Sequence, residues 1–289
     1  MYSEDELENP RGEKLAVHCW KPKETARALV FLAHGFSEHL GFYHEVAEFL
    51  TKEGFYVFGH DHVGHGKSGG LRAYIENVDD YCDDVIQHCS LMKAKYPDLK
   101  LFIVGHSMGG MISVRASLRN KDFFHGMVLN GPLIIPGPQI LGMDLRSTAI
   151  KTFVSRNVFK FLCWFNPETA LGRPDLRRLT RDEDMHEVLK NDELRWTGGC
   201  KVRLLLAFTD CLDANINQLS EVQTPFLIIH GSEDILCNPG GSHLLYRQSI
   251  CEDKKIKVYD GSKHQLFLEL PHVRKEAFQD VADWIKERI

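Results

Sequence analysis

The stretch that most constrains this chain joins an apolar run to a glycine-flanked serine and then to a helical pattern. Leu101–Val104 has the composition of a buried strand, the sequence G-H-S-M-G occupies 105–109, and a helical run spans Met111–Leu118. A G-x-S-x-G pattern at such a junction predicts a sharp strand-to-helix turn that presents the serine hydroxyl at the end of the strand. A plain glycine-rich turn with a serine N-cap stays open as the alternative. Ser107 is therefore the predicted nucleophile, and it needs partners elsewhere in the chain.

The glycines of this turn and the helix after it have separate physical reasons. Gly105 and Gly109 are expected where the backbone and neighbouring elements approach so closely that a Cβ would collide. A helix that begins at Ser107 directs free N–H groups and the positive end of its dipole at the site. That arrangement suits a developing negative charge.

Length and composition describe an ordinary globular chain. Its 289 residues are 43% hydrophobic and 26% charged, with a formal net charge of −5, which suits one large α/β core. The sequence has no basic tail and no basic run interleaved with aromatics, so we expect no nucleic acid partner. The N-terminus is acidic and polar rather than signal-like, and no apolar run reaches the roughly 18 residues of a spanning helix.

The cysteines are scattered singly and form no C-x-x-C pair. With no signal-like segment, we expect reduced thiols in a cytoplasmic protein. The positions are Cys19, Cys82, Cys89, Cys163, Cys200, Cys211, Cys237 and Cys251.

Strand-like and helix-like segments alternate at both ends of the chain. Strands are expected over 14–20 (an edge strand), 27–33, 55–58, 101–104, 126–130, 225–229 and 255–259, and helices over 43–52, 78–96, 241–248 and 271–289. This alternation predicts an α/β fold with a mostly parallel central sheet and helices on both faces. We expect 1–135 and 219–289 to form the core.

The alternation stops over 136–218, which predicts a helical cap inserted over the strand ends, where ligands bind in such sheets. Amphipathic helices are expected over 141–165, in part of 173–196 and over 201–217. The first of these carries an apolar side formed by Leu145, Ala149, Phe153, Val158, Phe161, Leu162 and Phe165. Basic residues lie among them, namely Arg146, Lys151, Arg156 and Lys160.

A serine nucleophile needs a general base, and the base needs a carboxylate that orients it. On a strand–turn–helix scaffold the chain order is serine, then Asp or Glu, then histidine. His264 follows the last expected strand and precedes the last helix, so it is the predicted base. Asp234 follows the strand that ends at Ile229 and is the predicted carboxylate.

Other carboxylates compete with Asp234 for this role. Glu233 is the nearest rival because it is adjacent, although neighbouring side chains point different ways. Asp260 is a weaker rival, since an aspartate that ends a strand before a glycine is ordinary turn chemistry. Asp210 and Asp213 fall in the insertion, away from the expected sheet.

Two backbone N–H groups are expected to bind the oxyanion of an acyl-transfer intermediate. One belongs to Met108, the residue after the nucleophile, and the other to Phe36, in the loop after an early strand. Gly35 lets the backbone of that loop approach, with a plain loop glycine as the alternative.

Three histidines, His60, His62 and His65, are spaced like metal ligands, but no fourth ligand is evident. We predict no metal site and no cofactor. The better interpretation is a tight loop in which Asp61 accepts hydrogen bonds from backbone N–H groups.

With Ser107, Asp234 and His264 in this order, the chain resembles the monoacylglycerol lipase family, serine hydrolases of the α/β-hydrolase fold and lysophospholipase-like type. The resemblance is carried by 34–39, 59–68, 105–110, 126–129, 225–234 and 261–271, of which 61–68 is the most family-specific. It implies hydrolysis of long-chain monoacylglycerol to fatty acid and glycerol through an acyl-enzyme. It also implies an apolar cap that touches a membrane while the enzyme stays cytoplasmic, and the apolar helices with Lys151, Arg156 and Lys160 fit that role.

The chain departs from the family in places. Ser37 stands where many members have glycine, and 136–218 matches weakly. Cys237 matches a family cysteine near the site and predicts thiol sensitivity, with a buried inert cysteine as the alternative. Other functions stay open: a lysophospholipase or carboxylesterase, an acyltransferase, or an inactive hydrolase used as a binding module. The oligomeric state also stays open, a dimer included.

Overall fold

The computed structural model describes residues 1–138, 150–172 and 175–289 of the chain. Within them, one 8-stranded sheet has the order β1-β2-β4-β3-β5-β6-β9-β10. The pairs from β4 to β10 are parallel, whereas β1–β2 and β2–β4 are antiparallel. The strands are β1 Tyr2–Glu8, β2 Lys14–Trp20, β3 Ala28–Ala33, β4 Phe55–His60, β5 Leu101–His106, β6 Gly126–Asn130, β9 Phe226–Gly231 and β10 Lys254–Tyr259. The predicted mostly parallel α/β fold is confirmed.

Alternate residues of the central strands enter two separate apolar clusters, one on each face of the sheet. On β5, Leu101 and Ile103 belong to one cluster while Phe102 and Val104 belong to the other. A strand buried on both faces reads as a continuous apolar run, which is why these strands are visible in the sequence. Helices α1 (His44–Lys52) and α8 (Pro271–Lys286) cover one face. Helices α2 (Val78–Lys95), α3 (Met108–Arg119) and α7 (Pro239–Gln248) cover the other.

The edge of the sheet corrects one expectation. Lys14–Trp20 forms β2 as predicted, but it is not the edge strand, because β1 pairs with it along its whole length. The sequence of β1, YSEDELE, is almost wholly exposed and strongly acidic. It therefore lacks the apolar pattern by which a strand is recognised, and charged side chains are what protects an exposed edge from pairing with other chains.

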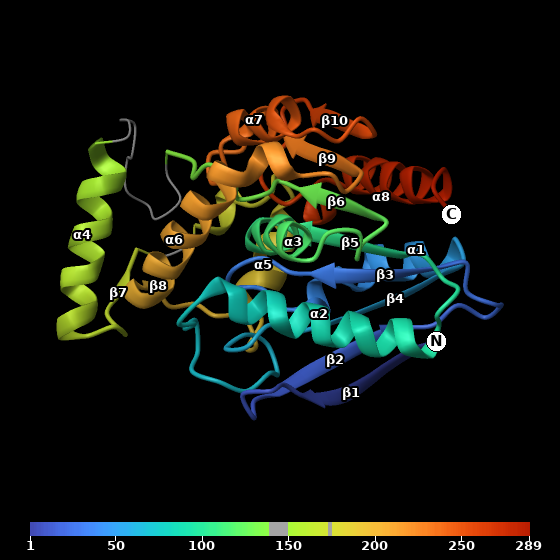
Figure 1. The fold of residues 1–289 in the computed structure, drawn as a ribbon, viewed down its shortest axis with the longest axis horizontal. Coiled ribbons are helices and arrows are strands. Elements are labelled where there is room, and N and C mark those ends of the chain that lie inside the picture. The colour runs from blue at the N-terminus through green and yellow to red at the C-terminus, as the bar shows by residue number, and fades with distance from the viewer. Residues whose placement is uncertain (139–149, 173–174) are drawn as a thin grey trace.

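The segment between β6 and β9 adds no strand to the large sheet among the described residues. It contains α4 (Ile150–Phe165), α5 (Glu183–Asn191) and α6 (Val202–Gln218), with a small antiparallel pair of β7 (Ala170–Leu171) and β8 (Cys200–Lys201). The arrowheads of β3 and β6 point toward the side where α4 and α6 lie (Figure 1). These elements therefore stand at the carboxyl ends of the parallel strands. Short 3-10 turns are η1 Leu40–Tyr43, η2 Leu176–Arg178, η3 Leu219–Glu221 and η4 Leu266–Leu268.

Helix α4 packs against α6 but leaves much of its apolar surface uncovered. Phe161, Trp164 and Phe165 are 60%, 79% and 65% exposed. Part of the apolar and basic pattern predicted here lies outside the described residues, namely Leu145, Arg146, Ala149 and the side chains of Lys151, Phe153 and Arg156. No helix in the described ranges has the length and apolar character needed to cross a bilayer.

Candidate active site

The predicted elbow is present between β5 and α3. Ser107 has φ 53° and ψ −114°, a left-handed conformation that costs a non-glycine residue on the order of 1–3 kcal/mol. A Cβ at Gly105 would lie 2.4 Å from the Gly109 carbonyl oxygen, and one at Gly109 would lie 2.1 Å from the Ala33 carbonyl oxygen. The close approach of β3, β5 and α3 thus requires glycine at both flanking positions. It also holds the half-buried Ser107 at the strand end.

Asp234 and His264 come together beside this elbow. His264 Nδ1 lies 2.6 Å from Asp234 Oδ2, and the two side chains are 4% and 0% exposed. Asp234 follows β9 and His264 follows β10, two neighbouring parallel strands whose carboxyl ends meet at one sheet edge. The rivals lie elsewhere, since both Glu233 and Asp260 are exposed.

Asp234 accepts more than the one bond from His264. Its Oδ1 accepts from the backbone N–H groups of Leu236 (2.8 Å) and Cys237 (2.9 Å), and its Oδ2 also lies 3.0 Å from His230 Nε2. Burial acts to raise the pKa of Asp234, but the two histidines outweigh burial and hold it below its usual range. An ionised carboxylate only accepts, so His264 donates its Nδ1–H to Asp234.

The Ser107 hydroxyl has a sulfur neighbour. Its Oγ lies 3.8 Å from Cys237 Sγ, and that thiol is 1% exposed. Burial raises the pKa of the Cys237 thiol well above its usual value, and the Asp234 charge adds to this. The thiol therefore stays protonated. In the described residues no hydrogen bond joins Ser107 to His264, although Sγ of Cys237 lies within 4.8 Å of a ring nitrogen of His264 and of a carboxylate oxygen of Asp234.

The two predicted oxyanion donors follow β3 and β5. In the described part of the chain, the backbone N–H groups of Phe36 and Met108 donate to no protein acceptor. Met108 begins α3, so the positive end of that helix dipole adds to its N–H. The Phe36 side chain packs with Cys200 and Leu205 and meets the ring of Phe208 at 6.5 Å. Phe36 thus joins the core loop to the helical segment above it.

A buried polar network behind these loops was not predicted. Glu38 Oε2 accepts from the Gly35 backbone N–H (3.0 Å) and the Tyr43 hydroxyl (2.7 Å). Glu38 Oε1 accepts from Gln265 Nε2 at 3.3 Å, and Asn130 Nδ2 donates to Gln265 Oε1 at 2.7 Å. The network ties the Gly35 loop to the residue after His264. The only signal in the sequence is that these polar residues stand next to predicted site residues.

The chain matches the family described as "Serine aminopeptidase, S33" over residues 24–271. It is 35% identical to a monoglyceride lipase of Mus musculus over 283 residues, which cover 98% of this chain and 90% of the relative. The chain belongs to the serine aminopeptidase S33 family. The resemblance, the fold class and the prediction of a carboxylic ester hydrolase are confirmed.

Solved structures share the fold of this family member. A monoacylglycerol lipase of Paleococcus ferrophilus superposes with TM-score 0.82 at 24% identity, covering 95% of this chain and 99% of that one. A soluble variant of monoglyceride lipase from Saccharomyces cerevisiae, in complex with a substrate analog, gives TM-score 0.82 at 24% identity, over 99% of this chain and 94% of that one. At this identity the likeness shows the fold.

The histidine-rich loop after β4 is held as a structural turn. Asp61 accepts from the backbone N–H groups of Leu40 (2.8 Å) and Lys67 (2.9 Å). Burial acts to raise its pKa, but His18, whose Nε2 lies 3.3 Å from Asp61 Oδ1, and other partners hold it below the usual range. His60 Nδ1 lies 3.2 Å from His88 Nδ1, so this ring points to α2. The predicted role of Asp61 is confirmed.

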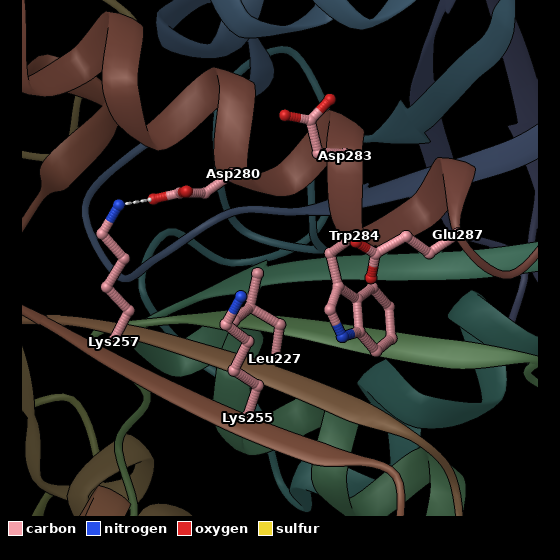
Figure 2. Close-up of a pocket in the computed structure, with 7 residues that line it drawn as sticks. All are labelled: Leu227, Lys255, Lys257, Asp280, Asp283, Trp284 and Glu287. Atoms are coloured by element: carbon pink, nitrogen blue, oxygen red, sulfur yellow. Dashed lines mark hydrogen bonds and ion pairs between the residues drawn. The ribbon is translucent and has the colours of Figure 1, made fainter.

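A pocket of about 200 Å³ lies at the other end of the strands from Ser107. Figure 2 shows Leu227 and Lys255, each near the start of its strand, facing Trp284 and Asp280 of α8. Lys257 pairs with Asp280 across it, and its Nζ lies 2.8 Å from Glu276. The charges of this pocket are thus largely satisfied within the protein, and none of the predicted catalytic residues lines it.

Proposed function

We propose that this protein hydrolyses long-chain monoacylglycerols to a free fatty acid and glycerol. The observation that carries the proposal is the 2.6 Å contact of Asp234 with His264 beside the Ser107 elbow. The substrate is supported by similarity over nearly the full chain to monoglyceride lipases. The assignment of catalytic roles rests on the geometry at the strand ends.

In the proposed reaction, His264 Nε2 takes the proton of the Ser107 hydroxyl as Oγ attacks the ester carbonyl. Asp234 keeps the imidazole in the tautomer that accepts this proton and stabilises the imidazolium. His264 then protonates the leaving glycerol oxygen, which breaks the ester bond and leaves an acyl-enzyme on Ser107. Water repeats the sequence on the acyl-enzyme, releases the fatty acid and restores the serine.

The Phe36 and Met108 N–H groups are the proposed oxyanion hole. Neither has a protein acceptor within the described residues. Phe36 follows β3 and Met108 starts α3 directly after β5, and these two strands lie side by side. In other enzymes one such donor is worth roughly 3 kcal/mol of transition-state stabilisation. The strained elbow supports this role, because the same turn that exposes Oγ starts the helix that carries the Met108 N–H.

We assign 136–218 as a cap over the core formed by 1–135 and 219–289. Phe36 contacts cap residues Cys200 and Leu205, and Phe159 joins the same apolar cluster. An acyl chain that extends from the ester carbonyl at Ser107 Oγ toward the cap meets apolar side chains. Glycerol is polar and gains no free energy from such contacts. The cap therefore provides the acyl-binding surface.

The exposed face of α4 is the proposed point of peripheral membrane contact. Val158, Phe161, Trp164 and Phe165 are exposed together, and Lys160 beside them is exposed as well. Aromatic side chains at a helix surface suit the boundary between headgroups and acyl chains, and a lysine suits anionic headgroups. Contact there would bring the cap to its lipid substrate.

Cys237 remains a prediction for thiol sensitivity. A reagent small enough to reach its buried sulfur would leave an adduct 3.8 Å from the nucleophile and block acylation. Because the thiol is protonated and almost wholly buried, the reaction is expected to be slow. Cys237→Ala should keep ester hydrolysis and lose this inactivation.

A fluorophosphonate probe tests the proposed function. The label is expected on Ser107, a long-chain monoacylglycerol is expected to block it, and Ser107→Ala should lose both labelling and turnover while it folds normally. Ser3→Ala, at an exposed serine of β1, is the control. Labelling that the lipid does not block would overturn the substrate, and no labelling of folded protein would overturn the nucleophile.

A further inference from the structure

Arg195 is largely buried, and no side chain among the described residues pairs with its guanidinium. Its side chain belongs to the segment between α5 and β8, and the residue is only 8% exposed. In the described part of the chain, the only hydrogen bond of Arg195 comes from its backbone N–H, and the guanidinium forms no ion pair. Arginine is almost never buried unless it is paired, because desolvating a guanidinium is expensive. None of its guanidinium nitrogens is among the fully buried atoms without a partner, so its five donors stay accessible to a bound acceptor.

The segment that carries Arg195 is fastened to the loop of the proposed oxyanion hole at two points. The Ser37 hydroxyl donates to the Trp196 carbonyl oxygen, and His39 Nε2 lies 3.0 Å from Asp192 Oδ1. The same Asp192 oxygen accepts from the Arg195 backbone N–H at 2.8 Å. Arg195 therefore lies between two residues that are bonded to Ser37 and His39, the neighbours of Glu38 in the loop that includes Phe36.

The Glu38 and Asp192 carboxylates act on the Arg195 guanidinium electrostatically, although neither forms an ion pair with it in the described part of the chain. Burial lowers the pKa of its guanidinium, while the Glu38 and Asp192 carboxylates act in the opposite direction. Glu38 accepts hydrogen bonds from Gly35, Tyr43 and Gln265, and in the described residues it forms no ion pair with Arg195. A positive and a negative group thus influence each other without being paired.

We propose that Arg195 binds the alcohol half of the ester substrate, donating hydrogen bonds to glycerol hydroxyl oxygens. The inference rests on the proposed function and names a residue that recognises the headgroup. An acyl chain offers no acceptor to a guanidinium, so the apolar half belongs beside Phe36 and Leu205 instead. Because the Glu38 and Asp192 carboxylates stand nearby, an uncharged polyol suits this position better than an anionic phosphate. A hydroxyl that accepts from Arg195 also keeps its own proton to donate.

The test compares two esters of one fatty acid, monooleoylglycerol and methyl oleate, in the same detergent dispersion. Arg195→Met keeps the length of the stem and removes the donors. We expect its kcat/KM for monooleoylglycerol to fall about 10- to 100-fold, as for loss of a hydrogen bond from a charged group, and that for methyl oleate to change less than about 2-fold. Arg195→Lys should recover part of the loss. Arg177→Met, with 81% of its side chain exposed on the cap surface, is the matched control and should leave both esters unchanged.

Other outcomes overturn the inference. Equal loss on both esters with Arg195→Met would make Arg195 a counter-charge for Glu38, and no loss on either would remove it from the site. Wild-type preference for oleoylglycerol phosphate, lost in Arg195→Met, would make the ligand anionic. If the wild-type protein hydrolysed methyl oleate but not monooleoylglycerol, the proposed function would be overturned instead. Circular dichroism melting curves show whether each variant folds.

Discussion

Two regions of the molecule differ in which side chains they bury. One is formed by the loops at the carboxyl ends of the strands, and the other by the helices between β6 and β9. Asp234 and His264 are almost wholly buried, and Asp234 accepts four hydrogen bonds. On α4, Phe161 and Trp164 are 60% and 79% exposed and contact little besides their own helix. The first region buries polar side chains that are hydrogen-bonded to one another, and the second exposes apolar side chains.

This difference separates two requirements. Proton transfer needs atoms fixed within a few tenths of an ångström, which burial and multiple hydrogen bonds provide. A lipid substrate needs an apolar surface that is free to be covered, and this is the role proposed for the exposed face of α4. The comparison predicts that changes in the strand-end loops alter the chemical step, and that changes in α4 alter access to lipid.

The largest effect is expected from Asp234→Asn, with a fall in kcat of about 10⁴-fold. An amide nitrogen cannot accept from His264, so the imidazole loses the tautomer that takes the serine proton. Glu233→Gln and Asp260→Asn, at exposed rivals, should keep wild-type rates. Steady-state hydrolysis of a soluble ester measures all three, and a comparable loss in Asp260→Asn would contradict the assignment.

Acid pH is expected to lower the free energy of unfolding by several kcal/mol, because buried histidines resist protonation. Burial lowers the pKa of His65, His88 and His106 to about 4. The unfolded chain titrates near 6.5, so from about pH 6.5 down to about pH 4 it takes up protons that the folded protein does not. Stability therefore falls over this window as the pH is lowered.

Urea unfolding at pH 7 and pH 5 measures this effect. His88→Phe should make the dependence on pH shallower, because one of the buried sites is gone. His243→Asn, at an exposed position on α7, is the control for removing a histidine. A pH dependence unchanged by His88→Phe would show that other groups cause the acid sensitivity.

On α4, the double change Phe161→Ser and Trp164→Ser is expected to weaken sedimentation with anionic phospholipid vesicles about 10-fold or more. The kcat/KM for a soluble short-chain ester should stay unchanged, since the strand-end loops are untouched. Ile250→Ser, at an apolar residue 57% exposed after α7, should leave vesicle binding intact. Equal binding by all three proteins would remove α4 from the membrane.

The smallest effects are expected where the two regions meet, at Ser37. Its φ of 66° favours glycine, but its hydroxyl donates to the Trp196 carbonyl oxygen. Ser37→Gly relieves strain and loses that bond, so its free energy of unfolding should stay within about 1 kcal/mol of wild type. Ser37→Ala loses the bond and keeps the strain, so it should be the less stable variant by about 1 kcal/mol. Thermal melts compare the pair, and the opposite order would contradict this balance.

The features predicted well from the sequence are those with one local cause. Strands β3, β5 and β9 are continuous apolar runs because both of their faces are buried. The elbow needs glycine at two positions for steric reasons. Asp234 and His264 were chosen by their positions after two predicted strands. Parallel strands end at the same edge of a sheet, so residues that follow them are expected near the end of β5, where Ser107 lies.

Features with distant causes were missed. The acidic strand β1 owes its conformation to pairing with β2 rather than to its own pattern. Gln265 and Glu38 meet only after the sheet has brought together loops at opposite ends of the chain. His230 lies in the segment 225–234, but no role was predicted for it, and its Nε2 contacts the same Asp234 oxygen as His264. Pairwise contacts of this kind are properties of the fold, and one sequence without its fold does not display them.

The order of the strands also sets when this protein becomes able to react. The elbow serine and both proposed oxyanion donors are complete once β5 and the start of α3 exist. Asp234 and His264 arrive only with the loops after β9 and β10. During synthesis from the N-terminus, the proposed nucleophile therefore lacks its proposed base and carboxylate until β9 and β10 have joined the sheet. Ester hydrolysis would then report that the sheet of a newly made molecule is assembled as far as β10.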